Sequence, residues 1–587
     1  MDTRRLMLLF VFVFSLYMLW GAWQEQQHPP APATAAAPVQ IDNAVTDNVS
    51  IPQFGRHATT PVTPLEANAA DLNIPPAESV FITTDLVKAE ISALGGNLVW
   101  LELQRYHADE NKPFSLFGFS FGSGTQESEK KLFTLFSDAH GYTAQTGLLG
   151  DVSDKKLPDH KTLLKVLPGP RELAEGKDTL QVRLAAPEVN GVQATKVYTF
   201  HRNSYLVDVA WEIENGSDAP LSADAYFQLQ RDGASPGGDS FMMSTFYGAA
   251  VYSDAEKYQK VTYKEIADGG AKFTKEANDG WLALVQHYFV TAWAPQGDVP
   301  RGFYMQKLGE GDIAHSLFRA GIRLPVAPIA PGAKGEISVP LFAGPQEQAA
   351  LKTVAPGLDL VVDYGWLHII AAPIFGVLEF IYALIGNWGW SIVALTVLIK
   401  LLFFPLSAAS YKSMARMRTM TPKLMQLKER YADDKARLNQ EMMKLYQTEK
   451  INPLGGCLPI LLQIPVFIAL YWVLLGAVEM RGAPWIFWIH DLSAADPYYV
   501  LPVIMMASMF IQTRLNPTPP DPIQAKMMLI MPLVFGIMFF FFPAGLVLYW
   551  VVNNVLSIAQ QWQINRLLDK GGKPGSNKPK AANDPKA

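Results

Sequence analysis

The chain has 587 residues, of which 49% are hydrophobic and 18% are charged, with a formal net charge of −5 and a single cysteine. This length exceeds what one compact core usually holds, and the low charged fraction is typical of a membrane protein. One cysteine excludes an internal disulfide and a CxxC metal or redox site, and the mildly acidic total argues against a generic nucleic-acid binder.

An apolar run over residues 6–23 follows a pair of arginines at the start of the chain. Such a run is typical either of a cleaved signal peptide or of an uncleaved signal-anchor. An Ala-rich stretch after Pro32 offers small residues for a cleavage site but lies well beyond the apolar run, and Trp20 and Trp23 suit the interface of a membrane. We therefore predict a membrane-spanning anchor over residues 1–23.

Residues 24–78 begin rich in proline and alanine and stay polar, which predicts a flexible linker. Short β-rich runs and turn signals such as Asn190-Gly191 come next, and residues 197–211 predict a hairpin that turns at His201–Ser204. Residues 79–345 are therefore expected to form an antiparallel β-sandwich, whose stability must come from its core because it has no cysteine.

Two carboxylates of this region are candidates for chemistry. Glu212 and Glu214 lie two residues apart in a predicted strand, so they share a face and resemble the acid pair of a glycosidase. Carboxylates on a solvated strand face are far commoner, and that interpretation is the one we favour.

Five apolar segments after residue 386 are each close to the length that crosses a bilayer. Short segments rich in Lys and Arg stay in the cytoplasm, which places the N-terminus, the basic segment 409–454 and the basic tail there. The chain is expected to be a multi-pass membrane protein with residues 24–363 outside the cytoplasm, which in a Gram-negative cell means an inner-membrane protein with these residues in the periplasm. The predicted spans are 387–408, 455–478, 498–514, 526–543 and 545–565, followed by the tail 566–587.

Charge is distributed in agreement with this topology, because residues 24–363 carry a net −14 and residues 364–587 carry a net +8. Residues 364–386 are also apolar and long enough to cross. A span there would put the N-terminus or the segment 409–454 on the wrong side. We predict instead an amphipathic helix that lies in the outer interface.

Lys400 is the most informative polar residue, because a charge inside a span costs a few kcal/mol. One interpretation is a functional charge that faces a wet cavity lined by protein. The alternative is an anchor that snorkels, since Lys400 lies about 9 Å of helix from the end of its apolar run. Thr396 precedes it by one turn and shares its face.

Other spans carry polar residues as well, and any one of them could simply hydrogen-bond a neighbouring helix. Their presence in four spans together favours a hydrated groove near the cytoplasmic half. These residues are Gln463, Ser508, Gln512, Thr513, Asn553, Asn554 and Ser557.

The segment 409–454 predicts a helical hairpin. Thr421-Pro422 is typical of a helix start, Asp433-Asp434 of a turn that caps a second helix, and Asn452-Pro453 of its end. Methionine is flexible and suits the binding of varied apolar segments. The alternative is that these methionines only pack within the hairpin. The basic residues of the segment could also bind anionic lipid. The methionines are Met414, Met417, Met420, Met425, Met442 and Met443.

Motifs of nucleotide or protease chemistry are absent from the sequence: it contains no P-loop, no HExxH and no nucleophile elbow. Cys457 lies at the edge of a span and has no second cysteine to pair with. We expect neither a cofactor nor a metal, and no enzymatic activity.

Three motifs resemble the YidC/Oxa/Alb family of membrane protein insertases: NPLGGCLPILLQIPVF at 452–467, WIHDLS with DPYY within 488–499, and FPAGLVLY at 542–549. The resemblance implies a multi-domain membrane protein with a signal-anchor helix, a periplasmic β-supersandwich and a five-span α-helical core. It further implies a hydrophilic groove that inserts and helps to fold inner-membrane proteins without nucleotide hydrolysis, alone or with the Sec translocon.

The resemblance also implies roles for particular residues. The groove arginine of the family corresponds to Lys400, which keeps the charge but loses bidentate hydrogen bonding. The family's substrate-contacting threonine and aromatic residue correspond to Thr396 and Trp550. The partners implied are nascent membrane proteins, the ribosome, the Sec translocon with SecY, SecD and SecF, and the phospholipid bilayer, with no sequence-specific nucleic acid.

Two other classes of function are compatible with a large soluble domain joined to a polytopic core. A solute transporter would be expected to show repeat symmetry around a midplane site, and we see no clear repeat. The second class is a sugar-binding or scaffolding protein that its membrane part merely anchors.

Overall fold

The computed structural model divides into two compact units. The sheet unit runs up to Gly344 and includes Lys352–Leu358, and the helical unit comprises Pro345–Leu351 and the chain from Asp359. The predicted anchor over 1–23, the linker up to residue 77, Cys457 and the tail beyond Gly571 lie outside the described residues. The described ranges are 78–108, 114–116, 119–121, 131–152, 154–235, 246–431, 434–448, 458–515 and 522–571.

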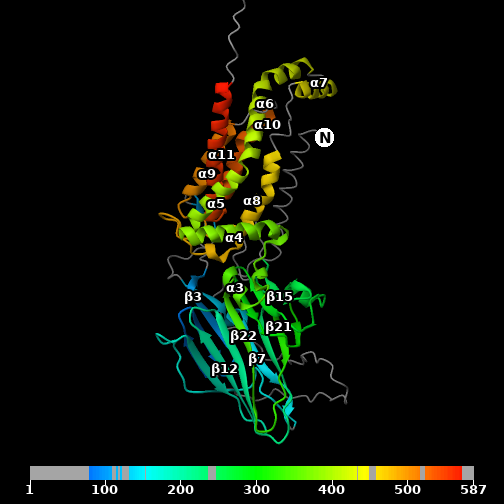
Figure 1. Ribbon diagram of the computed structural model, residues 1–587, viewed down its shortest axis with the longest axis vertical. Coiled ribbons are helices and arrows are strands. Elements are labelled where there is room, and N and C mark those ends of the chain that lie inside the picture. The colour runs from blue at the N-terminus through cyan, green and yellow to red at the C-terminus, as the bar shows by residue number, and fades with distance from the viewer. Residues whose placement is uncertain are drawn as a thin grey trace, which may run out of the picture. The chain divides into compact units, whose positions relative to one another are not determined.

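Within these residues, the sheet unit contains two antiparallel sheets of nine strands each (Figure 1). The first sheet is ordered β1 (Ser79–Thr83), β2 (Val87–Ser92), β3 (Leu98–His107), β7 (Thr143–Leu149), β14 (Asp224–Asp232), β21 (Leu317–Pro325), β20 (Arg301–Leu308) and β17 (Glu276–Ala277), with β6 (Leu132–Phe136) paired to β3.

The second sheet is ordered β10 (Lys165–Val166), β11 (Thr179–Ala185), β12 (Val192–His201), β13 (Leu206–Asn215), β22 (Lys334–Pro345), β19 (Phe289–Trp293), β18 (Trp281–Gln286), β15 (Gly248–Ser253) and β16 (Lys257–Val261). The small elements are the hairpins β4 (Phe114–Leu116) with β5 (Phe119–Phe121) and β8 (Asp151–Val152) with β9 (Lys155–Lys156), and the helices α2 (Tyr263–Ala267) and α3 (Gln348–Val354).

The two sheets pack face to face around aromatic side chains, which confirms the predicted antiparallel sandwich. Phe227 of β14 packs against Trp293 of β19 with ring centroids 5.2 Å apart. Trp211 of β13 is fully buried, and its indole Nε1 donates to Thr146 Oγ1 of β7 at 2.9 Å. The predicted hairpin around His201–Ser204 is present as β12 and β13. A buried indole whose N–H is hydrogen-bonded joins the two sheets both by its buried apolar surface and by that hydrogen bond.

One turn of the sheet unit requires glycine. Gly95 and Gly96 connect β2 to β3 and both have positive φ, at +68° and +58°. A Cβ atom on Gly95 would lie 2.0 Å from the carbonyl oxygen of His160. The close backbone approach leaves room for no side chain, and it directs the Gly95 and Gly96 carbonyls into the core.

In the helical unit, α4 lies crosswise to α8, α9 and α11 (Figure 1). The long helices of this unit are α4 (His368–Ile385), α5 (Trp388–Leu402), α6 (Phe404–Arg430), α7 (Lys435–Thr448), α8 (Leu458–Gly476), α9 (Val500–Leu515), α10 (Pro522–Met538) and α11 (Ala544–Gly571), and short 3-10 turns lie at Gly365–Leu367 and Val478–Met480.

Among the described residues, α4 is the one helix that is by itself long and apolar enough to cross a membrane. The helix α5 passes the same test together with the first part of α6, Phe404–Lys412, although the two are bent by 61°. Shorter apolar stretches lie at Gln463–Gly476, Val500–Leu515 and Lys526–Phe541. The placement of α4 in the outer interface therefore stays a proposal.

The bend between α5 and α6 has a cause in the sequence. Helix α5 begins at an N-cap, because Asn387 Oδ1 accepts from the backbone N–H of Trp390 at 3.0 Å. The helix ends at Leu402, and Pro405 lies in the first turn of α6, where its missing N–H costs no hydrogen bond. In a continuous helix, the ring of Pro405 would clash with the carbonyl of Leu401, and its missing N–H would leave that carbonyl unpaired, so the chain turns at Phe403 and starts a new helix.

One prediction about the hairpin is wrong. Thr421-Pro422 was expected to start a helix, yet α6 runs without a break from Phe404 to Arg430. A proline inside a helix removes one backbone hydrogen bond and disturbs the preceding turn, and a helix of this length tolerates that loss. The second half of the hairpin agrees with the prediction, because Asp434 Oδ1 accepts from the backbone N–H of Arg437 at 3.0 Å at the start of α7.

Candidate functional site

A strip of polar side chains runs along α11 through the middle of the helical unit. Asn553, Ser557 and Gln561 are spaced four residues apart, so they lie on one face, with Asn554 beside them. Each of the four hydrogen-bonds a residue outside α11. The strip therefore joins α5, α8 and α9 through polar contacts rather than through apolar packing alone.

Lys400 meets this strip at Ser557. Its ammonium Nζ donates to Ser557 Oγ at 2.7 Å, and the side chain is half-buried. Lys400 belongs to the last turn of α5, where the unpaired carbonyls give the helix end a partial negative charge that stabilises a cation. The ammonium is therefore directed at α11, which favours the interpretation of a charge facing protein over that of a snorkelling anchor.

Tyr411 of α6 lies close to the same hydroxyl. In one straight helix, residues 400 and 411 would lie about 16 Å apart along the axis. The bend at Phe403 and the length of both side chains bring them to one oxygen atom. Ser557 Oγ also donates to the backbone carbonyl of Asn553 at 2.7 Å, so this hydroxyl has hydrogen bonds to both Lys400 and Asn553.

The remaining bonds of the strip tie α11 to α8 and α9. Gln463 Nε2 of α8 donates to Asn553 Oδ1 at 3.3 Å. Asn554 Nδ2 donates to Ser508 Oγ of α9 at 3.2 Å, and both residues are buried. Buried amides and hydroxyls that are paired in this way stabilise the bundle and fix its register. The structure thus brings Lys400, Gln463, Asn553 and Asn554 together.

Three other predicted site residues lie near the strip but outside its hydrogen bonds. The hydroxyl of Thr396 is 1% exposed and donates to the carbonyl of Ile392 in its own helix at 2.6 Å. Gln512 is half-buried on α9, and within the described part of the chain no hydrogen bond joins it to the strip. Trp550 is half-buried, with its ring centroid 3.9 Å from that of Phe467 on α8.

In the described part of the chain, Lys400 is not paired with an acid. Among the residues that the structure describes, no Asp or Glu forms an ion pair with it. A cation in a helix bundle usually pairs with a carboxylate or reaches water, because burial of an uncompensated charge is costly. Lys400 instead has a neutral hydroxyl as its acceptor, which uses one of its three N–H donors.

Large apolar side chains cover the outside of the helices around this site. On α5, Leu398, Leu401 and Leu402 are 50%, 64% and 72% exposed. On α10, the exposed side chains are Leu529, Ile530, Leu533, Val534 and Ile537. Water-soluble proteins rarely expose apolar surface on this scale, so these faces are suited to lipid.

The methionines of the hairpin divide into two groups. Met420 is buried, at 4% exposure, and contributes to packing. Met425 of α6 and Met443 of α7 are about half exposed, at 51% and 55%, and Met442 is partly exposed. The side chains of Met414 and Met417 lie outside the described set. The exposed members are the ones placed to contact a partner.

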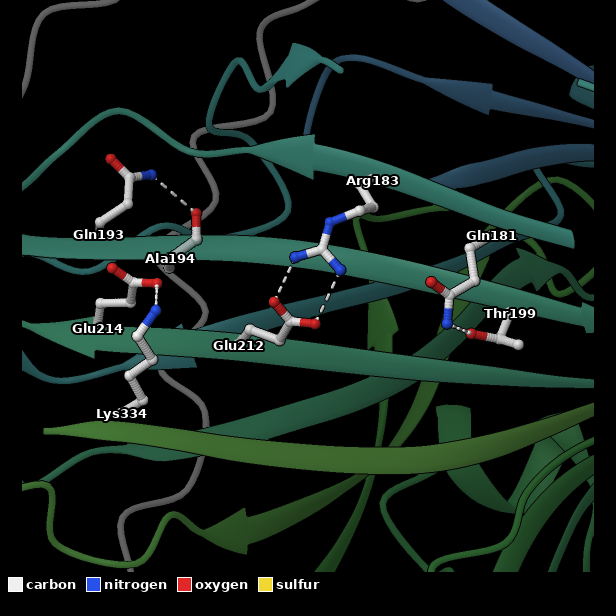
Figure 2. Close-up of polar contacts among 8 residues, drawn as sticks. All are labelled: Gln181, Arg183, Gln193, Ala194, Thr199, Glu212, Glu214 and Lys334. Atoms are coloured by element: carbon white, nitrogen blue, oxygen red, sulfur yellow. Dashed lines mark hydrogen bonds and ion pairs between the residues drawn. The ribbon is translucent and has the colours of Figure 1, made fainter. Parts of the chain in front are cut away.

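The carboxylates of the sheet unit that resemble a glycosidase pair are both neutralised by neighbouring cations. Figure 2 shows Arg183 of β11 holding Glu212 through two hydrogen bonds, and Lys334 of β22 bound to Glu214. The hydrogen bonds that Arg183 donates to Glu212 raise the pKa of Arg183 above its ordinary value. Acids held in this way on an exposed strand face are surface ion pairs, which agrees with the sequence interpretation.

A metal site is not indicated either: in the described ranges, no group of three or more His, Cys, Asp or Glu side chains could hold an ion. The site is therefore one ammonium, a set of hydroxyls and amides, and an aromatic cluster. Such a set can attract and orient a polar or acidic segment.

Sequence reasoning missed the acceptor of Lys400, Ser557, and the approach of Tyr411 to that serine. Ser557 was counted only as one of several polar residues, although its position four residues after Asn553 puts both on one face of α11. Tyr411 carried no usable signal, because its approach to Ser557 depends on the bend at Phe403. Helix periodicity identifies a shared face, whereas a contact across a bend needs the fold.

Comparison with known proteins follows the same division of the chain. A family described as "60Kd inner membrane protein" matches residues 380–571, and one described as "YidC periplasmic domain" matches residues 123–377. The chain is 60% identical over 589 residues to "Membrane protein insertase YidC" of Dechloromonas aromatica (strain RCB), covering 100% of both chains. It is 54% identical to the protein of the same name from Aromatoleum aromaticum, covering 98% of this chain and 100% of that one.

A solved structure titled "Active YidC insertase crystal structure with the first transmembrane domain resolved" is similar to 83% of this chain and 94% of its own. The sequence identity is 19% and the TM-score is 0.37.

Proposed function

The chain belongs to the YidC family of membrane protein insertases, and on that basis we propose that it inserts its substrates along the polar strip of α11, with Lys400 as the attracting charge. It is an inner-membrane protein with a periplasmic domain, and its activity is insertion rather than enzymatic turnover. The observation that carries the proposal is the ammonium of Lys400, which has a hydroxyl and no described carboxylate as its partner.

The first step of the proposed route takes place at the hairpin α6–α7. A nascent apolar segment contacts the exposed methionines there, Met425 and Met443. Unbranched thioether side chains adapt to apolar surfaces of different shape at little cost in strain. This contact holds the substrate close to the membrane without requiring any particular sequence.

In the second step, the polar flank of the substrate enters a groove whose wall is the strip on α11, with Thr396, Gln512 and Trp550 beside it. Lys400 attracts acidic residues of this flank, and the amides Gln463 and Asn553 offer hydrogen bonds in place of water. Polar groups that find such partners partway across a bilayer avoid most of the cost of entering hydrocarbon. No nucleotide is needed for this step.

The third step moves the apolar segment sideways into lipid. The exposed leucines of α5 show that apolar surface lies directly beside the polar strip. Burial of a substrate helix in lipid releases about 0.8 kcal/mol for each methylene group removed from water. We infer that this burial drives insertion, while the strip only lowers the barrier for the polar flank.

The proposed topology places the N-terminus, the hairpin and the C-terminal tail in the cytoplasm, with α4 in the outer interface. The basic excess of residues 364–587 and the exposed apolar face of α4, with Ile369 84% and Phe380 65% exposed, support this arrangement. The proposed partners are nascent membrane proteins, the ribosome, and the Sec translocon with SecY, SecD and SecF. Help in substrate folding belongs to the same proposal.

Site-specific crosslinking tests the route. A photoreactive residue at position 396, 400 or 550 is expected to crosslink to ribosome-bound nascent membrane proteins at the stage when their polar flank crosses. Position 397, where Val397 points outward at 37% exposure, is the matched control and should give lipid adducts instead. Crosslinks to substrate at 397 but at none of the three would contradict the route along α11.

A further inference from the structure

Ser557 is placed to do more than join two helices. It is 4% exposed, and its single hydroxyl proton goes to the backbone carbonyl of Asn553 at 2.7 Å. A hydroxyl has one proton and two lone pairs. The proton is used within α11, so the oxygen presents a lone pair to Lys400.

The hydrogen bond within α11 fixes the direction of these lone pairs. An isolated serine hydroxyl rotates and would offer its proton as readily as its lone pairs, whereas this one is held as an acceptor. The ammonium of Lys400 is therefore bound at a defined place on α11, 2.7 Å from Ser557 Oγ. One of its three donors is used there.

The neutrality of Ser557 matters for exchange with a substrate. A carboxylate at this place would form a charge-assisted bond with Lys400, about twice as strong as a bond between neutral groups. An acidic residue of a substrate would then have to displace this carboxylate, which carries the same negative charge, from the ammonium of Lys400. Against a neutral hydroxyl, the same acidic residue gains an ion pair and gives up only an ordinary hydrogen bond.

We propose that Ser557 is a positioning and specificity-determining residue: it holds the Lys400 ammonium on α11 through a neutral acceptor that an acidic residue of the substrate can replace. This inference rests on the proposed role of Lys400 in insertion. Ser557 would then determine the preference for substrates whose translocated segment carries Asp or Glu. The reason is that the substrate competes with Ser557 for the ammonium of Lys400, and a weak competitor favours an acidic substrate.

The sharpest test compares Ser557→Asp with Ser557→Asn in proteoliposomes. The two side chains are nearly equal in size and differ in charge, so steric effects cancel in the ratio. The substrates are one single-span protein with two aspartates in its translocated tail and the same protein with two asparagines. The acidic-to-neutral insertion ratio should be at least about tenfold lower for Ser557→Asp, since close charge pairs at such sites couple by about 1.5 kcal/mol or more.

Ser508→Asp controls for the cost of a new buried acid. Ser508 is 5% exposed and bonds Asn554 rather than Lys400, so this variant should lower insertion of both substrates without changing their ratio. Should Ser557→Asp fail to fold, Ser557→Ala and Ser557→Thr replace it. The alanine variant should lower the acidic-to-neutral ratio by about threefold, as expected for loss of one hydrogen bond, and threonine, which keeps the hydroxyl, should restore it.

An unchanged ratio in Ser557→Asp relative to Ser557→Asn would overturn the inference, as would an unchanged ratio in Ser557→Ala where the aspartate variant does not fold. Lys400→Ala separates this failure from failure of the proposed function. When Lys400→Ala loses the preference for acidic tails and the Ser557 variants keep it, only the role of Ser557 is wrong. When Lys400→Ala keeps that preference as well, the role of Lys400 in insertion is wrong too.

Discussion

Two lysines of this protein lie in protein surroundings without a described carboxylate partner, one in each unit, and they are held in different ways. Lys196 of β12 is fully buried, donates to the carbonyl of Gly95 at 3.0 Å, and has Nζ 5.4 Å and 5.5 Å from the ring centroids of Tyr198 and Trp211. Lys400 is half-buried, with the hydroxyl of Ser557 as its acceptor.

The difference shows what distinguishes a structural charge from an available one. Backbone and aromatic rings enclose Lys196, and burial holds its pKa well below the ordinary value. Nothing can approach it without unfolding the sheet unit. Lys400 keeps part of its surface open, and its acceptor is a side chain that a stronger acceptor can replace. A charged side chain without a counter-ion therefore indicates a function only where a substrate can reach that side chain.

The largest effect on stability is expected at Lys196. Lys196→Ala leaves a cavity between β12 and the Gly95 turn and removes a buried hydrogen bond, so the free energy of unfolding of the sheet unit should fall by about 3 kcal/mol. Chemical denaturation of the full-length protein in nanodiscs, followed by hydrogen exchange of β12, measures this loss. Lys334→Ala is the control, because Lys334 is an exposed partner of Glu214 and should cost less than about 1 kcal/mol. Equal losses in the two variants would contradict the structural role of Lys196.

A pH dependence of the helical unit is expected from Glu479, which follows α8. Glu479 Oε1 accepts from the backbone N–H of Gln348 at 3.4 Å, while its Oε2 is buried without a hydrogen bond. Burial raises the pKa of Glu479 to about 7, and the neighbouring carboxylates of Glu347 and Glu379 act in the same direction. Tyr364, which hydrogen-bonds Gln348, also faces this cluster.

The direction in which stability changes with pH follows from the raised pKa of Glu479. The folded state keeps the proton of Glu479 between about pH 4.5 and 7, whereas the unfolded state releases it, so stability is highest below about pH 4.5 and falls as the pH rises to about 7. Glu479→Gln should remove this slope, an effect on the order of 2 kcal/mol between pH 5 and pH 7. Thermal unfolding in nanodiscs at several pH values measures it. A variant that retains the full slope would assign the dependence to another group.

The smallest effect is expected at the surface pair of the sheet unit. Arg183 and Glu212 are each 40% exposed, so Glu212→Gln should change the free energy of unfolding by less than about 1 kcal/mol and should leave insertion unaffected. The difference should shrink further in high salt, because exposed ion pairs are screened. A loss of insertion in this variant would show that the sheet unit acts on substrates through these carboxylates.

The sequence predicted the elements of the molecule better than its contacts. Periodicity and turn chemistry were sufficient for β12 and β13, and for the antiparallel sandwich they belong to. The Asp434 cap of α7 was also read correctly, whereas Thr421-Pro422 was not, because a proline signals a helix start and an interior kink alike. Short sequence patterns such as periodicity, turn residues and caps therefore predict the local structure of the chain.

The candidate site was predictable only in part. Lys400 was identifiable because a lysine inside an apolar run is expensive, and the amides of α11 because they share a helical face. The acceptor of Lys400 was not identifiable, since Ser557 lies 157 residues further along the chain. The role of Tyr411 depends on a 61° bend whose size no sequence pattern states.

The central claim is that the charge of Lys400 attracts the polar flank of the substrate. Charge reversal tests it most directly: insertion into proteoliposomes is measured for tails that differ only in two aspartates or two lysines, with the unaltered protein, Lys400→Ala and Lys400→Glu. The account predicts that the unaltered protein favours the acidic tail, that Lys400→Ala loses the preference, and that Lys400→Glu favours the basic tail. Equal insertion of both tails by all three proteins would contradict it.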